Sequence, residues 1–243
     1  MASTRMPSKP LQTLLDKPLI QHVHQRAMES GAQRVVIATD HESICQAAQR
    51  FGAQICMTGS HHQSGTDRLA EVVDSLRMGD DEVLVNLQGD EPCMPGHLIR
   101  KVALLLDDQT VSMGTLAAPI HDVKTVADPH VVKVVTNRKG FALYFSRAAI
   151  PFDRDANSTL AGNYFKHIGI YAYRAGFLRR FIQWPPADIE RTEKLEQLRA
   201  LWQGVDIKVA VTDEVFGPGV DTMEELHLAG QWLQSHTFRG LGE

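Results

Sequence analysis

Short apolar, β-rich runs alternate with amphipathic helical patterns in this 243-residue sequence, and this alternation constrains the fold more than any other feature. In the first half the strand-like runs are RVVIATD (34–40), AQICMT (53–58) and EVLVNLQ (82–88). The helical patterns around them are PLIQHVHQRAMES (18–30), HESICQAAQRF (41–51), TDRLAEVVDSLR (66–77) and GHLIRKVALLL (96–106). Repeated strand–helix–strand order with near-continuous apolar strands predicts an α/β fold, in which helices cover both faces of a mostly parallel sheet.

The middle of the chain departs from this pattern. Strand-like runs at 110–120, 131–136, 141–147 and 166–174 follow one another there, and NRKG (137–140) is typical of a hairpin turn. We therefore expect a small antiparallel excursion over about 110–180, within a single domain that spans residues 1–243. The expected elements after the excursion are two helical segments (176–184 and 189–202), a strand (207–212) and a helix (223–236).

Composition narrows the class of protein. The net charge of −4 argues against a general nucleic-acid binder, which needs a broad basic face. The three cysteines have no close metal-ligand spacing, and their odd number argues against a disulfide framework. The longest apolar runs are far too short to span a membrane, and no signal peptide is evident. We expect a cytoplasmic protein whose partners include neither nucleic acid nor membrane.

Two carboxylates in distant loops form a candidate metal site. Asp90 and Glu91 in NLQGDEP follow a predicted strand, and ligands gather beyond the carboxyl ends of strands in open parallel sheets. Asp221 precedes the last helix, and it is spare because Thr222 and Glu225 already have the spacing of a capping box. Asp90 and Asp221 together suit one Mg²⁺. The alternatives are a turn-stabilising Asp90 and a helix-capping Asp221.

The stretch HHQSGTDRLAE (61–71) has the composition of an anion-binding helix start. Backbone N–H groups at such a start favour anions, and the hydroxyls of Ser64 and Thr66 can contact a base or a ribose. The alternative is an ordinary helix cap with a solvated Arg68. Adjacent His61 and His62 point in different directions and have no third ligand at a matching spacing, which disfavours zinc.

The opening loop ASTRMPSKPL (2–11) is basic and stiffened by two prolines. Arg5 and Lys9 in such a loop suit a polyphosphate, and arginine can bind a phosphate through two hydrogen bonds. The alternative is a disordered tail.

A third group of polar residues falls in or just after the antiparallel excursion: Arg147, Arg154, His167, Tyr171, Glu196 and Gln197. Each of them by itself is compatible with a surface residue or a satisfied core residue. Together they suit a pocket for an acidic, hydroxyl-rich molecule, although spacing alone does not bring them together.

In order along the chain, these motifs resemble a known family. The stretches STRMPSKPL, ATDH, HQSGTDRLAEV, VNLQGDEP, VKVV, ALYFSRAAIPFDRD, HIGIYAYR, LEQLR and GVDT are similar to those of the 3-deoxy-manno-octulosonate (Kdo) cytidylyltransferases. The resemblance implies a three-layer fold of the nucleotide-diphosphosugar transferase type, with a mixed, mostly parallel sheet. It also implies that a Mg²⁺-dependent cytoplasmic homodimer transfers CMP from CTP to Kdo for lipopolysaccharide biosynthesis and releases pyrophosphate.

The resemblance assigns roles to the candidate residues. Arg5 and Lys9 would contact the CTP phosphates and, with Asp90, form the catalytic set, while Asp90 and Asp221 would bind Mg²⁺. The residues around the cytidine would be Ser64, Thr66, Arg68 and Gln88. Those around the sugar acid would be Arg147, Arg154, His167, Tyr171, Glu196 and Gln197, and the excursion would also mediate dimerisation. A nucleophilic Ser or Cys is not required, because attack on the α-phosphorus needs in-line positioning and neutralised charge more than covalent help.

The sequence departs from the family in two places. The family begins with an apolar strand ending in IPAR, directly ahead of the opening loop, and by that comparison the first strand and its arginine are missing here. Ser8 stands where the family has Gly, which is strained if φ is positive there. Two alternatives therefore stay open: a cytidylyltransferase for another sugar acid, such as a sialic-acid relative, and a non-catalytic CTP-binding remnant.

Overall fold

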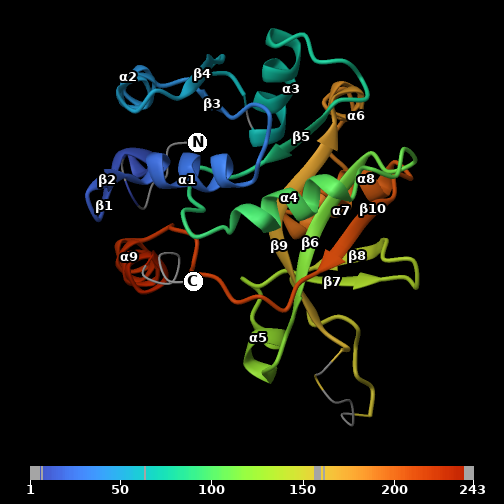
Figure 1. Cartoon of the computed structure of the whole chain (residues 1–243). Helices are drawn as coiled ribbons and strands as arrows, with labels where there is room; N and C mark the ends of the chain where they lie inside the picture. The colour runs from blue at the N-terminus through green and yellow to red at the C-terminus, as the bar shows by residue number, and fades with distance from the viewer. Residues whose placement is uncertain (1–5, 7, 63, 156–159, 161, 238–243) are drawn as a thin grey trace. The chain divides into compact units, whose positions relative to one another are not determined.

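The structure is a computed structural model that describes residues 6, 8–62, 64–155, 160 and 162–237 (Figure 1). The chain divides into two compact units, and each unit is assembled from separate stretches of sequence. The first unit comprises 1–78, 87–100 and 215–243, and the second comprises 79–86 and 101–214. The single domain expected over 1–243 stays a prediction.

The first unit is built from short strands and helices. Its elements are the 3-10 helix η1 (Lys9–Leu11), β1 (Thr13–Leu14), β2 (Lys17–Pro18), α1 (Leu19–Glu29), β3 (Val36–Thr39), α2 (Glu42–Arg50), β4 (Gln54–Met57), α3 (Gly65–Ser75) and α9 (Met223–Thr237). Helix α4 (Gly96–Leu104) begins in this unit. Strands β3 and β4 pair in parallel, and β1 and β2 form an antiparallel hairpin.

Two apolar clusters form the core of the first unit. In one, Ile20 and Val23 of α1 pack with Ile37 of β3 and Ala48 of α2. In the other, Leu19 packs with Leu226, Ala229 and Leu233 of α9 and with Val220, Cys93, Leu14 and Met6. Because neighbouring residues of α1 belong to both clusters, this helix is buried on more than one side, and the turn after β5 and the loop before α9 are held against it.

The second unit contains a six-stranded mixed sheet, counted over its described residues. Its elements are β5 (Val83–Asn86), β6 (Met113–Pro119), α5 (Val123–Ala127), β7 (Lys133–Thr136), β8 (Ala142–Ser146), β9 (Phe165–Arg174), α6 (Ala175–Phe181), α7 (Asp188–Glu193), α8 (Leu198–Trp202) and β10 (Ile207–Val211). The strand order is β10-β6-β9-β7-β8, and β5 also pairs with β9.

The long strand β9 organises this sheet, and Figure 1 shows it beside β6. It runs antiparallel to β5, β6 and β7, while β10 is parallel to β6 and β8 is antiparallel to β7. Strands β5, β6, β7 and β10 therefore point one way, and β8 and β9 point the other. The predicted α/β fold with a mixed, mostly parallel sheet and an antiparallel excursion is confirmed, although β9 makes most neighbouring pairs antiparallel.

Most elements expected from the sequence are present within a few residues of their predicted bounds. The NRKG hairpin is confirmed, since the Gly140 N–H donates to the Asn137 carbonyl at 2.9 Å and Gly140 has φ 74. The single helix expected over 189–202 is wrong: α7 ends where Lys194 adopts the left-handed conformation at φ 55, and α8 begins only at Leu198. None of the described helices is long and apolar enough to cross a membrane.

Ser8 adopts the positive φ that is strained for a residue other than glycine. Its backbone lies at φ 51 and ψ 36, in the left-handed region, directly before η1. A residue with a Cβ atom in this region costs about 1–2 kcal/mol relative to the right-handed region, and glycine avoids this cost.

We therefore expect Ser8→Gly to raise the free energy of unfolding by about 1 kcal/mol, after allowance for the greater backbone entropy of glycine in the unfolded chain. Urea denaturation measures the change. Ser75→Gly is the matched control: Ser75 is exposed at the end of α3 in a helical conformation, and the same substitution there should lower stability. Equal effects at the two positions would contradict the strain at Ser8.

Candidate functional site

Lys9 brings the two predicted metal-binding carboxylates together in the first unit. Its Nζ donates to Asp90 Oδ2 at 2.6 Å and to Asp221 Oδ1 at 2.9 Å. The Lys9 side chain is only 13% exposed, whereas that of Asp221 is 67% exposed. A basic loop, the turn after β5 and the loop before α9 therefore meet at one ammonium group, with one carboxylate open to solvent.

Local backbone contacts place the two carboxylates. The Val220 N–H donates to the Asp90 carbonyl at 2.8 Å, which ties the two loops together. Thr222 and Glu225 exchange the reciprocal hydrogen bonds of the predicted capping box, at 2.9 and 3.2 Å. The side chain of Asp221 is therefore not needed to cap α9, and it reaches Lys9 instead.

The loop before α9 passes so close to its neighbours that a side chain at Gly217 does not fit. A Cβ atom there would lie 2.5 Å from Cγ of Trp232 and 2.7 Å from Sγ of Cys93. Glycine at this position therefore lets the loop approach α9 and the turn that carries Asp90.

The charges of this cluster influence one another. Burial alone would lower the pKa of Lys9, but the hydrogen bonds and negative charges of Asp221 and Asp90 raise it overall. Glu91 is the neighbour that the sequence prediction left without a role. Burial, together with the charges of Asp90 and Asp221, raises its pKa to about 7. A protonated Glu91 leaves the negative charge on the two carboxylates that contact Lys9.

The oxygen donors of Asp90 and Asp221 are of the kind that suits a hard divalent cation such as Mg²⁺. Among the residues that the structure describes, no group of three or more His, Cys, Asp or Glu side chains forms a ready-made metal site. Mg²⁺ in nucleotide enzymes is typically held by one or two carboxylates, with phosphate and water oxygens completing the octahedron. Asp90 and Asp221 offer that partial set. His62 Nε2 instead lies at hydrogen-bond distance from the Glu71 carboxylate, which argues against the zinc alternative.

At the helix start 64–68, the side chains of Ser64 and Arg68 already make contacts within the protein. Ser64 is the N-cap of α3: its side chain accepts from the Asp67 N–H at 3.1 Å, and Asp67 returns a hydrogen bond to the Ser64 N–H. Arg68 is not solvated, because its guanidinium contacts Thr58 and forms an ion pair with Asp40 at 3.1 Å. The guanidinium thereby links the ends of β3 and β4 to α3.

The other nucleotide candidates differ in how accessible they are. Thr66 is buried, whereas Gln88 is exposed on the turn that leads to Asp90. Arg5 lies outside the described residues. The described candidates for CTP and metal binding all belong to the first unit.

His167 and Tyr171, both on β9, lie side by side in the second unit. Their ring centroids are 5.3 Å apart, and the Phe145 ring packs against His167 in a T-shaped arrangement. Thr115 Oγ1 hydrogen-bonds His167 Nε2 at 2.9 Å. Thr115, which the sequence analysis did not single out, is buried within β6 and lies opposite Tyr171 in the register of β6 on β9, so no local pattern of the sequence could have found it.

Burial shapes the chemistry of this pair. It lowers the pKa of His167 to about 3, so the imidazole is neutral. The Tyr171 hydroxyl is buried, and no residue that the structure describes hydrogen-bonds to it. Burial and then the charges of Tyr173 and Glu196 raise the pKa of Tyr171 well above its usual range, so it stays a hydroxyl. A buried donor without a partner is costly, which marks this position as one that a polar ligand would satisfy.

The remaining sugar-acid candidates all belong to the second unit, but they differ in their contacts and exposure. Arg147 donates through Nε to the Glu193 carbonyl at 2.8 Å and through Nη1 to the Pro129 carbonyl at 3.0 Å. Gln197 is buried, and Glu196 lies 3.7 Å from Arg199 in an ion pair. Arg154 is exposed in the loop after β8. The structure therefore brings His167, Tyr171 and the charge of Glu196 together, but it does not show Arg154 joining them.

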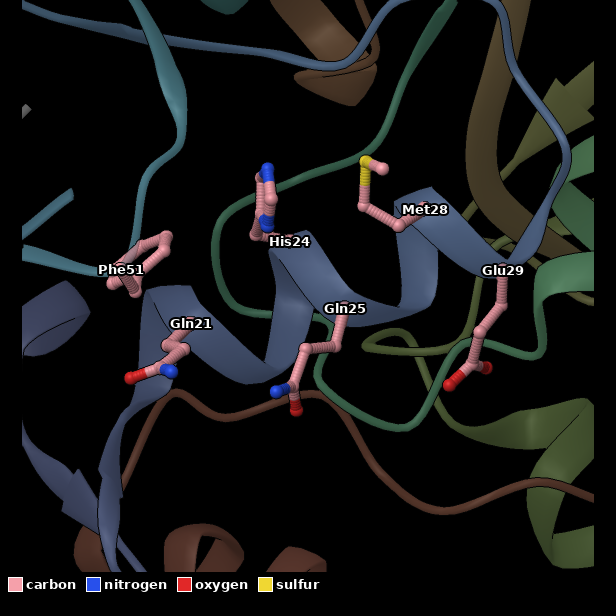
Figure 2. A pocket seen from close by; sticks show the side chains of 6 residues that line it. All are labelled: Gln21, His24, Gln25, Met28, Glu29 and Phe51. Atoms are coloured by element: carbon pink, nitrogen blue, oxygen red, sulfur yellow. The ribbon is translucent and has the colours of Figure 1, made fainter. Parts of the chain in front are cut away.

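A further hollow of about 530 Å³ lies along α1 and contains none of the predicted site residues (Figure 2). Its lining residues are Gln21, His24, Gln25, Met28, Glu29 and Phe51. Figure 2 shows most of these side chains projecting from α1, with Phe51, the residue after α2, near Gln21.

The chain is similar to known proteins over most of its length. A family model described as cytidylyltransferase matches residues 1–207. Among solved structures, CMP:2-keto-3-deoxy-manno-octonic acid synthetase complexed with CTP is 39% identical in sequence. The match covers 96% of this chain and 94% of that one, with a TM-score of 0.89. This likeness extends over both units and confirms the fold expected from the resemblance.

The partly buried, neutral imidazole of His167 makes stability depend on pH. His167 takes up a proton at about pH 6.5 when unfolded but only at about pH 3 when folded, so the unfolded state binds more protons between these values. The stability of the wild type should therefore fall, relative to His167→Asn, as the pH decreases from 6.5 to 4, with a slope approaching ~1.4 kcal/mol per pH unit. Denaturant titrations at a series of pH values measure the difference.

His130→Asn is the control for this experiment, because His130 is exposed. Its stability should follow that of the wild type across the same pH range. A constant difference between wild type and His167→Asn from pH 6.5 to 4 would contradict the neutral state of the His167 imidazole.

Proposed function

Because the chain belongs to the cytidylyltransferase family, we propose that it transfers CMP from CTP to 3-deoxy-D-manno-octulosonate, giving CMP-Kdo and pyrophosphate. The observation that carries this proposal is the 39% identity, over nearly the whole of both chains, to a CMP-Kdo synthetase solved with CTP. The product would enter lipopolysaccharide biosynthesis. The carboxylate pair on Lys9 and the unsatisfied Tyr171 hydroxyl are the geometric features that support it.

Charge balance supports Mg²⁺ as the cofactor. Asp90, Asp221 and Lys9 together carry a net charge of −1, which opposes the approach of a triphosphate. Asp90 and Asp221 would hold Mg²⁺ through their oxygens, and the ion would neutralise phosphate charge and supply electrostatic stabilisation of the pyrophosphate leaving group. With the carboxylates so engaged, Lys9 would be available to donate to phosphate oxygens, alongside Arg5.

The nucleotide would be recognised by the loops around α3 and the turn after β5. The exposed amide of Gln88 offers both a donor and acceptors for the edge of the cytosine base. Ser64 would contribute at the start of α3, where backbone N–H groups favour anions. Thr66, which is buried, and Arg68, which bridges Asp40 and Thr58, would keep this loop in shape.

The sugar acid would be recognised in the second unit. The Tyr171 hydroxyl would gain its missing partner from a sugar hydroxyl, and the neutral His167 would keep its hydrogen bond to Thr115. Arg147 and Arg154 would bind the sugar carboxylate, and Glu196 and Gln197 would accept from or donate to sugar hydroxyls. Transfer would then need the anomeric hydroxyl in line with the α-phosphorus and its departing pyrophosphate, which is a matter of positioning.

We extend the proposal to a cytoplasmic homodimer. Phe152 is 84% exposed and Leu143 of the edge strand β8 is also exposed, both within the antiparallel excursion expected to mediate dimerisation. Such side chains support an interface between copies of the chain. Cys45, Cys56 and Cys93 are all free thiols, as suits a reducing compartment. Sedimentation equilibrium would measure the oligomeric state.

The test of the reaction is pyrophosphate release from CTP, Mg²⁺ and Kdo. Asp90→Asn keeps the shape of the side chain and removes its charge, so we expect turnover to fall at least ~100-fold with little change in stability. Lys9→Met should lower turnover similarly, because it leaves the phosphates without the ammonium group. Asp16→Asn, exposed in the turn between β1 and β2, is the matched control and should retain wild-type activity.

A substrate panel separates the alternatives. Release of pyrophosphate with a sialic acid but not with Kdo would identify a cytidylyltransferase for another sugar acid. CTP binding without pyrophosphate release from any sugar acid would identify a non-catalytic binding protein. Near-normal turnover in Asp90→Asn would contradict the assignment of Asp90 to the metal.

A further inference from the structure

A completely buried lysine lies beside Arg147 in the second unit. Lys133, the first residue of β7, is 0% exposed. Its Nζ donates hydrogen bonds to three backbone carbonyl oxygens, those of Asp128 at 2.8 Å, Val131 at 2.6 Å and Arg147 at 2.6 Å. An ammonium group has three N–H donors, so every donor of Lys133 is used within the protein.

The three carbonyls come from segments that strand pairing does not hold. Asp128 follows α5, Val131 lies between α5 and β7, and Arg147 follows β8. In the register of β7 on β8, Lys133 lies opposite Ser146, so Arg147 is one residue beyond the last pair. Burial lowers the pKa of Lys133 in spite of the nearby charges of Asp128 and Glu193. Because burying a cation is costly, these carbonyls must stay at the ammonium group for the folded state to be stable.

The 128–131 turn that Lys133 holds also contacts the side chain of Arg147. Pro129, inside the 128–131 turn, accepts from Nη1 of Arg147, and Glu193 accepts from its backbone N–H at 2.9 Å and from Nε. Lys133 therefore holds Arg147 in two ways. It donates to the Arg147 carbonyl, and it holds the turn whose Pro129 carbonyl accepts from the Arg147 guanidinium. In the part of the chain that the structure describes, nothing accepts from Nη2 of Arg147, which leaves this edge of the guanidinium for a carboxylate.

We infer that Lys133 is a positioning residue for the sugar-acid site, whose ammonium group holds Arg147 and the 128–131 turn so that the guanidinium meets the substrate carboxylate in one fixed orientation. The inference rests on the proposed function, since it takes a sugar acid as the partner of Arg147. Lys133 itself does not touch the substrate, because it is fully buried and its donors are all occupied.

The kinetic test uses Lys133→Met in the full chain, since methionine fills a similar space without a donor. The KM for Kdo should rise about tenfold, while the KM for CTP stays within about twofold, because the nucleotide candidates lie in the first unit. Lys166→Met is the matched control: Lys166 is exposed on β9 and pairs in register with Lys133, and its loss should leave both constants unchanged. An unchanged KM for Kdo, or equal rises in both constants, would overturn the inference.

A second measurement does not depend on activity. Amide hydrogen exchange in the free protein should become faster over 128–131 and 146–148 in Lys133→Met but not in Lys166→Met, because the Arg147 N–H would lose its fixed position on Glu193. Wild-type exchange in Lys133→Met would overturn the positioning role whichever substrate the enzyme uses. Absence of turnover with Kdo in the wild type, by contrast, would reject the proposed function alone.

Lys133→Gln decides the matter if Lys133→Met does not fold, because its amide keeps two donors. A severalfold rise in the KM for Kdo with a constant KM for CTP would support the inference. A wild-type KM for Kdo in folded Lys133→Gln would overturn it.

Discussion

Cationic side chains withdrawn from water hold the loops of this protein in place. Lys9 joins three segments of the first unit through two carboxylates, and Lys133 joins three segments of the second unit through backbone carbonyls. Arg174 is buried as well, and its guanidinium donates to the carbonyls of Asp81, Leu106, Asp108 and Val111. A buried cation destabilises the folded state unless its donors find oxygen atoms, so each of these groups dictates where the surrounding loops lie.

This arrangement suits a reaction that depends on positioning. Transfer of a nucleotidyl group requires neutralised phosphate charge and an aligned hydroxyl, and little covalent chemistry. In the first unit Lys9 contacts the carboxylates of Asp90 and Asp221, whose oxygens are also of the kind that can bind a metal ion. The net charge of this site would therefore change when a metal ion binds. In the second unit two polar groups, His167 and Tyr171, are kept neutral, because burial holds the pKa of His167 low and the pKa of Tyr171 high. The two units thus offer different electrostatic environments, which the proposed function would use for phosphates and for a hydroxylated acid, respectively.

Much of the candidate site was predictable because its residues follow local rules. The capping box of Thr222 and Glu225 could be recognised by its spacing, and it correctly left Asp221 spare. The same kind of rule found Ser64 at the start of α3, where the structure supports the helix cap offered as the alternative interpretation. The alternative interpretation of Arg68 as a solvated side chain is wrong, because Arg68 forms an ion pair with Asp40. Asp40 is distant in sequence, and no local pattern connects the two residues. Thr115, Glu193 and Lys133 were missed because their importance arises from strand register and from burial.

The sequence by itself determined the alternation of strands and helices, the turn at 137–140, the family resemblance and the identity of most candidate residues, because periodicity, turn chemistry and motifs are local properties. Tertiary structure alone decided that Lys9 contacts both Asp90 and Asp221, that β9 runs against three neighbours, and that His167 hydrogen-bonds Thr115. It also decided that Lys133 is buried among three carbonyls. These arrangements follow from which segments meet when apolar surface is buried, and a charged side chain reveals its role only when the partners that compensate its loss of water are in place.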